Sequence, residues 1–128
     1  MRTIKFRGQH LCGQWYYGNL IVRETDSPVP ETPQAYKCVM IGDVEDGSAE
    51  EVEEETIGQF TCLFDKNGKE IYEGDVIKCG LRLYVCEFIE GGFEFRDLSD
   101  GNLVLKAIVN NSCIIGNIHD NPELLKRE

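Results

Sequence analysis

The stretch QFTCLFDKNGKEIYEGDV, residues 59–76, decides the local fold of this chain. Within it, Asp65-Lys66-Asn67-Gly68-Lys69 is a turn sequence between apolar, β-prone residues, and Glu73-Gly74 marks a second turn a few residues later. So many turn residues in a short segment require two short antiparallel strands and a sharp corner. We predict a structural turn motif made of Asp65, Asn67, Gly68, Tyr72, Glu73, Gly74 and Asp75.

Similar strand and turn patterns fill the C-terminal half of the chain. Alternating apolar and polar residues predict strands over 57–64, 75–79, 81–90, 93–96 and 113–118. Tight turns are expected at Gly91-Gly92 and Ser99-Asp100-Gly101, and residues 102–109 fit either a strand or one short helix. Asn121-Pro122-Glu123 has the cap, the first-turn proline and the first-turn acid of a helix. The pattern predicts a mainly β fold, namely an SH3-like small β-barrel with an N-terminal β extension and a short C-terminal helix.

A length of 128 residues fits a single domain. We expect an N-terminal β part at 1–42, with strands over 3–7, 14–22 and 36–41 and a proline-rich loop at 26–33. An acidic loop follows at 43–55, and the barrel with its C-terminal helix takes up 56–128.

The composition favours a protein of the cytoplasm. The chain is 41% hydrophobic, but no stretch approaches the roughly 18 apolar residues of a membrane helix. The first residues alternate charged and apolar side chains, unlike a secretory signal. Six cysteines without any Cys-x-x-Cys pair are then expected to be free thiols. His10 and Cys12 could contribute two metal ligands, but no second close pair completes a zinc site, so we expect neither metal nor cofactor.

The net charge of −10 is concentrated in one segment. Residues 38–65 hold nine acids and no Lys or Arg, which leaves 14 acids and 13 bases elsewhere. This balance disfavours direct binding of nucleic acid through a broad basic face. We expect residues 43–55 to form a mobile loop, or a short helix from Ser48 to Glu55, that folding does not need. The functional alternatives are a cation site or a docking surface for a partner.

Most catalytic motifs are missing. The chain has no phosphate loop, no Gly-x-Ser-x-Gly and no His-Glu-x-x-His, and the calcium pattern beginning at Asp65 fails at its sixth and twelfth positions. Glu70, Glu73 and Asp75 could form an acid–base group, but carboxylates in a turn are mostly solvated. Trp15, Tyr16 and Tyr17 could stack on bases, yet without clustered Lys or Arg they favour core or interface packing.

Four segments together resemble the YopX family of bacteriophage and prophage proteins. They are RTIKFRG (2–8), GQWYYGNL (13–20), TIGQFTCLFDKNGKEIYEGDVI (56–77) and IIGNIHDNPELL (114–125), in the family's order. Cys62 and Phe64 stand where the family has a glycine and a charged residue. The resemblance implies an SH3-like fold and a phage or mobile-element origin, in a bacterial host cell. It implies no activity and supplies no catalytic residues.

Three functions compete on this evidence. The first is a non-enzymatic phage accessory protein that binds a protein partner, with homo-oligomers expected. The second is an acidic mimic of DNA that inhibits a host nucleic-acid-binding protein. The third, ranked last, is a hydrolase-type enzyme that uses Glu70, Glu73 or Asp75. The residues expected to bind a partner are Trp15, Tyr16, Tyr17, Glu50, Glu51, Glu53, Glu54 and Glu55.

Overall fold

The computed structural model describes residues 3–26, 35–43 and 45–125. The chain is mainly β, with about 53% of residues in strands, two antiparallel sheets and only 3-10 helical turns. The predicted proline-rich loop lies, apart from Asp26, outside the described residues. None of the described helices is long and apolar enough to cross a membrane.

The chain divides into two compact units, which are described separately. Unit 2 comprises Ile4–Gly58, and unit 1 comprises Met1–Thr3 with Gln59–Glu128. The finer division of a single domain at residues 42 and 55 stays a prediction.

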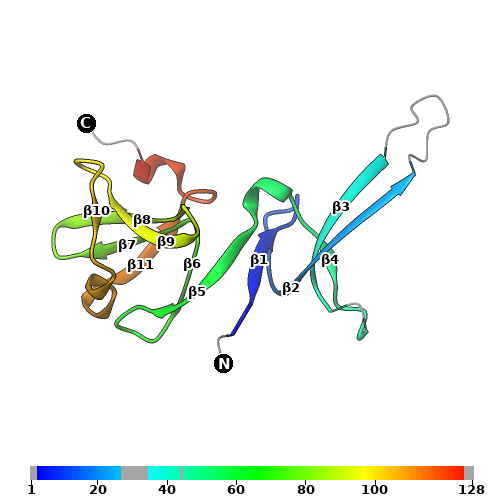
Figure 1. Cartoon of the computed structure of the whole chain (residues 1–128), viewed down its shortest axis with the longest axis horizontal. Coiled ribbons are helices and arrows are strands. Elements are labelled where there is room, and N and C mark those ends of the chain that lie inside the picture. Colours follow the sequence, from blue (N-terminus) through cyan, green and yellow to red (C-terminus); the bar gives the residue numbers. More distant parts are fainter. Residues whose placement is uncertain (1–2, 27–34, 44, 126–128) are drawn as a thin grey trace. The chain divides into compact units, whose positions relative to one another are not determined.

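Unit 2 contains four antiparallel strands in the order β4-β3-β2-β1 (Figure 1). The register places Gly8 opposite Tyr16, and Leu20 opposite Ile41. One face of this sheet packs a small core around Ile41, together with Val39 and Val52. The elements are β1 (Phe6–Gln9), β2 (Trp15–Asp26), β3 (Ala35–Gly42), β4 (Glu50–Glu51) and the 3-10 turn η1 (Glu54–Thr56).

Unit 1 contains the paired strands β5 and β6 and a five-stranded antiparallel sheet in the order β10-β9-β8-β7-β11 (Figure 1). Tyr84 and Cys86 of β8 lie in the core together with Phe95. The elements are β5 (Gly58–Phe64), β6 (Glu70–Tyr72), β7 (Asp75–Cys79), β8 (Arg82–Ile89), β9 (Gly92–Asp97), β10 (Leu103–Val104), η2 (Lys106–Asn111), β11 (Cys113–Asn117) and η3 (Pro122–Leu125).

Four details differ from the sequence-based expectations. Within the described residues, the sheet of unit 1 ends at β10 and β11 and no closed barrel forms, because these strands do not pair with each other. The turn between β8 and β9 is Glu90-Gly91, whose positive φ angles of 49° and 85° suit a two-residue hairpin. The C-terminal helix is the 3-10 turn η3. Segment 43–55 contains β4 and the start of η1 instead of a plain loop.

The turns predicted at Gly68 and Gly74 are confirmed. Gly68 and Gly74 have φ angles of 79° and 93°, in the region that glycine adopts without a Cβ penalty. All six cysteines are free thiols.

Cys62 interrupts β5 with a backbone conformation that does not suit its side chain. Its φ is 69°, and the pairing of β5 with β6 shifts register between Phe60 and Phe64. We expect the free energy of unfolding of the Cys62→Gly variant to be about 1 kcal/mol higher than that of Cys62→Ala. Glycine has no Cβ and therefore avoids the steric cost of the left-handed backbone conformation. Urea denaturation of both variants measures this difference. Equal stability would show that residue 62 is not strained.

Candidate functional site

The strongest charge feature of unit 2 is an acidic edge, which we define as Glu50, Glu51, Glu53, Glu54 and Glu55. Glu50 and Glu51 form β4 and pair with Ile41 and Met40 of β3. Glu54 and Glu55 open η1, and both are exposed, whereas Glu53 is half-buried. Five carboxyl groups therefore lie on six consecutive residues, and two of them belong to the edge strand β4.

Val52 anchors this acidic edge to the fold. Its side chain is 5% exposed and packs against Val39 and Ile41. Its N–H donates to the Val39 carbonyl at 3.0 Å. A Cβ on Gly8 would lie 2.7 Å from Val52 Cγ2, so the missing side chain at Gly8 makes room for Val52. Val52 therefore attaches the acidic edge to the unit 2 core, whereas a mobile loop was expected; that folding does not need the segment stays a prediction.

Hydrogen bonds also fix the segment that follows Val52. The Glu53 N–H donates to the Gln9 carbonyl at 2.9 Å, and the Gln9 N–H donates to Thr56 Oγ1 at 2.8 Å. These bonds hold the start of η1 against β1, so that the glutamates are presented from a defined backbone.

The carboxylates of the edge have different partners. Lys37 Nζ pairs with Glu54 at 2.6 Å, and this contact raises the lysine pKa. The Cys38 thiol donates to Glu51 Oε2 at 2.9 Å, which raises the pKa of Cys38. A side-chain hydrogen bond to Glu55, assisted by burial, raises the pKa of Glu53. The Glu53–Glu55 contact brings two like charges together, which is unfavourable when both are ionised.

A depression of about 150 Å³ lies beside the edge, lined by His10, Leu11, Glu51, Val52 and Glu53. His10 Nδ1 accepts a hydrogen bond from the Cys12 N–H at 3.0 Å. No group of three His, Cys, Asp or Glu side chains that could hold a metal ion occurs among the described residues. The lining of the depression thus combines two acidic residues with the exposed apolar Leu11.

The three aromatic residues expected to bind a partner are divided between the two faces of β2. Tyr16 packs against the unit 2 core. Trp15 and Tyr17 point to the other face, since side chains alternate along a strand. There the Arg7 Cζ lies 4.8 Å from the Trp15 ring centroid, a cation–π geometry, and Tyr17 is 54% exposed. Of the three, Tyr16 has a structural role.

The predicted turn motif is organised by Asp65. Its Oδ1 accepts hydrogen bonds from the N–H groups of Asn67 and Lys69, both at 2.9 Å. Its Oδ2 accepts from the Ile114 N–H of β11 at 3.0 Å, and Gly68 donates to the Asp65 carbonyl. Burial opposes ionisation of Asp65, but these amides outweigh it and lower its pKa. Asp65 is therefore a structural residue that joins the turn to β11.

The second turn of the motif also uses its polar groups for structure. Asp75, which is 2% exposed, accepts the Tyr72 N–H at 2.7 Å. The Tyr72 hydroxyl donates to Glu70 at 3.1 Å, and the Glu73 N–H donates to the Gln59 carbonyl at 3.0 Å. At least two of the three carboxylates considered for catalysis, those of Glu70 and Asp75, thus accept hydrogen bonds within their own corner.

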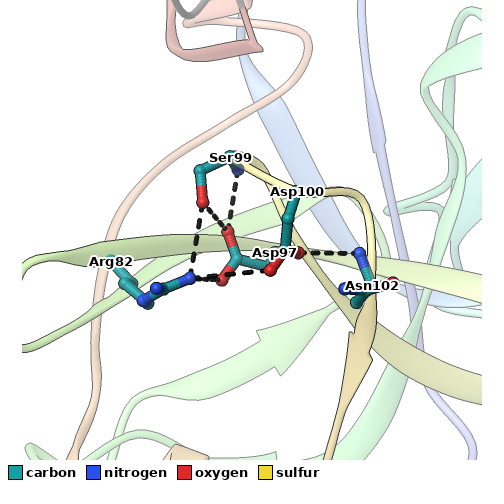
Figure 2. A network of polar contacts seen from close by, with 5 residues as sticks. All are labelled: Arg82, Asp97, Ser99, Asp100 and Asn102. Carbon is teal, nitrogen blue, oxygen red and sulfur yellow. Dashed lines mark hydrogen bonds and ion pairs between the residues drawn. The ribbon is translucent and has the colours of Figure 1, made fainter.

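A further polar network, which the sequence did not predict, surrounds Asp97 (Figure 2). Asp97 Oδ2 accepts from Arg82 Nη1 at 2.6 Å, and its Oδ1 accepts from the Ser99 hydroxyl and N–H at 2.6 and 2.8 Å. Asp100 Oδ1 accepts the Asn102 N–H at 2.9 Å, and Asp100 Oδ2 lies 3.7 Å from Arg82 Nη1. The Asp-x-Ser-Asp-Gly sequence signals the turn, but the arginine comes from β8, 15 residues earlier in the chain.

The Asp97 network predicts a specific dependence of stability on pH. The Ser99 donors and Arg82 lower the pKa of Asp97 well below its usual range. A carboxyl group whose pKa is lower in the folded state makes its full contribution to the free energy of unfolding above its unfolded pKa of about 3.9. This contribution is lost as the pH falls below that value. We expect Asp97→Asn to lower the melting temperature by several degrees at pH 7. Thermal unfolding at a series of pH values should show that the difference in melting temperature between the wild type and Asp97→Asn becomes smaller in acid. A difference independent of pH would contradict the ionic role of Asp97.

The comparisons with known proteins identify the family. The family model described as YopX protein matches residues 5–126, so the chain belongs to the YopX family. A crystal structure of protein EF1440 from Enterococcus faecalis is similar, with a TM-score of 0.56 and 24% identity over 97% of this chain and 99% of that one. At this identity the likeness concerns the fold alone. No curated protein matches the chain.

Proposed function

We propose that this YopX family protein is a phage or prophage accessory protein that binds a protein partner and carries out no reaction of its own. In this proposal it acts in the cytoplasm of the bacterial host. The observation that carries the proposal is the acidic edge, because its glutamates are held on a fixed backbone. A surface whose shape is set before binding loses less entropy when a partner docks.

The exposed charge suits recognition of a basic protein surface. Complementary charge increases the association rate and discriminates against wrong partners. A nucleic acid would be repelled from the same edge by its phosphates. The five short strands of the unit 1 sheet support a fold related to SH3 domains whose barrel is not closed. The proposal also includes homo-oligomers formed through the aromatic face of β2.

A capture experiment with matched variants tests the proposal. One variant carries Glu50→Gln, Glu51→Gln, Glu54→Gln and Glu55→Gln. The control carries Glu24→Gln, Glu45→Gln, Glu90→Gln and Glu123→Gln, which changes the net charge equally at exposed positions outside the edge. The wild-type chain and the control, each immobilised, should retain the same defined protein from bacterial lysate, and the edge variant should lose it.

Two outcomes would contradict the proposal. If both variants lose binding equally, the interaction depends on net charge and not on the acidic edge. If no protein is retained at stoichiometric level, the binding function itself fails. Release of the captured protein by added DNA would favour the DNA-mimic alternative, because a mimic and DNA occupy the same site on the target.

A further inference from the structure

The depression beside β4 combines the two features that a long cationic side chain requires. Glu51 and Glu53 are acidic residues of its lining, and Leu11 supplies exposed apolar surface. Leu11 is 80% exposed, which leaves its side chain available for contact. Arginine packs its methylene stem on apolar surface while its guanidinium group contacts carboxylates.

The charges around the depression favour a cation supplied from outside. Lys37 pairs with Glu54, whereas within the described part of the chain Glu51 and Glu53 form no ion pair. Among the residues that the structure describes, Glu51 accepts a hydrogen bond only from the weak Cys38 thiol donor, and Glu53 contacts Glu55. The third titratable residue of the lining is His10, whose Nδ1 accepts a hydrogen bond from the Cys12 N–H, and the charge of Arg23 acts on Cys38. A guanidinium group that contacts both Glu51 and Glu53 would offset the negative charge of these two carboxylates.

The size of the depression agrees with one side chain. Its volume is about 150 Å³. This space is too small for a folded element and sufficient for the end of an arginine.

We propose that the depression lined by His10, Leu11, Glu51, Val52 and Glu53 binds an arginine side chain of the protein partner. The inference rests on the proposed function, since the partner supplies the arginine. It adds the chemistry that the partner must present, which is an exposed arginine on a basic surface.

Nuclear magnetic resonance of the full-length, isotope-labelled chain tests this site directly. The probe is the acetylated and amidated tripeptide Gly-Arg-Gly, and its control is Gly-citrulline-Gly, which has nearly the same shape without the charge. We expect saturable shifts of the Leu11 and Val52 methyl signals and of the Glu53 amide with the arginine peptide only. The variant Glu53→Gln should bind about fivefold more weakly, while Glu45→Gln, with the same charge change, should bind like the wild type.

The outcomes separate this inference from the proposed function. Shifts spread over the whole acidic segment, equal effects of both peptides, or equal weakening by the two variants would overturn the arginine site. If that happens while capture of a protein still depends on the acidic edge, the proposed function stands without this site. Saturable shifts at the depression with no protein retained in the capture experiment would uphold the cation site and overturn the proposed function.

Discussion

Replacing Asp65 by alanine should lower the free energy of unfolding of unit 1 by about 3 kcal/mol, because three backbone N–H groups lose a charged acceptor. The donors are those of Asn67, Lys69 and Ile114, at 2.9 to 3.0 Å from the carboxylate. Asp65 is 6% exposed, so water replaces these bonds poorly. Urea denaturation followed by far-ultraviolet circular dichroism measures the loss.

Matched variants identify which part of this loss comes from the carboxylate. Asp65→Asn keeps the shape and one carbonyl acceptor, so it should lose less stability than Asp65→Ala. Lys66→Ala changes the exposed neighbour and should have little effect. The lowered pKa of Asp65 means that its contribution is complete at neutral pH and is lost as the pH falls below about 4. If Asp65→Ala has the same free energy of unfolding as the wild type, the turn does not depend on the Asp65 carboxylate.

The turn around Asp65 could be predicted from sequence because its determinants are local. An aspartate that accepts amides two and four residues later follows from its own chain neighbours. The bond from Ile114 to the same carboxylate spans 49 residues, and no local pattern reveals such a partner. For the same reason the sequence indicated a turn at Ser99-Asp100-Gly101 and missed Arg82. Alternation of apolar and polar residues predicted the strand at 81–90, which the structure has as β8, whereas barrel closure depends on long-range pairing of β10 and β11.

The candidate site shows where charge patterns are insufficient. The sequence located the acids of 43–55 but predicted that they repel one another and remain mobile. In the structure the segment is instead attached to the core by a single apolar residue, Val52. Its side chain reaches the core because Gly8 has no side chain at that place. This contact joins residues that are far apart in the sequence. A glycine in a strand indicates that another part of the chain packs closely on it, but the sequence does not identify which residue does so. The depression that follows from this anchoring was therefore not predicted.

Val52→Ala should lower the free energy of unfolding of unit 2 by about 2 kcal/mol, because two buried methyl groups are lost and a small cavity remains. Fluorescence of Trp15, the only tryptophan, reports on this unit during urea denaturation. The exposed neighbour provides the control, since Glu50→Ala removes no buried surface and should change stability by less than about 0.5 kcal/mol.

A double-mutant cycle with Gly8 distinguishes this contact from a general effect of the segment. In the wild type, Gly8→Ala should destabilise, because the added Cβ would meet Val52 Cγ2 at 2.7 Å, Val52 Cβ at 2.9 Å and Ile41 Cγ1 at 3.1 Å. In the Val52→Ala background the first of these clashes is removed, so the same change should cost less, and the coupling between the two positions should be measurable. Additive effects would mean that Val52 does not pack on Gly8. An unchanged stability of Val52→Ala would restore the acidic segment as a dispensable loop and remove the fixed backbone on which the proposed binding surface depends.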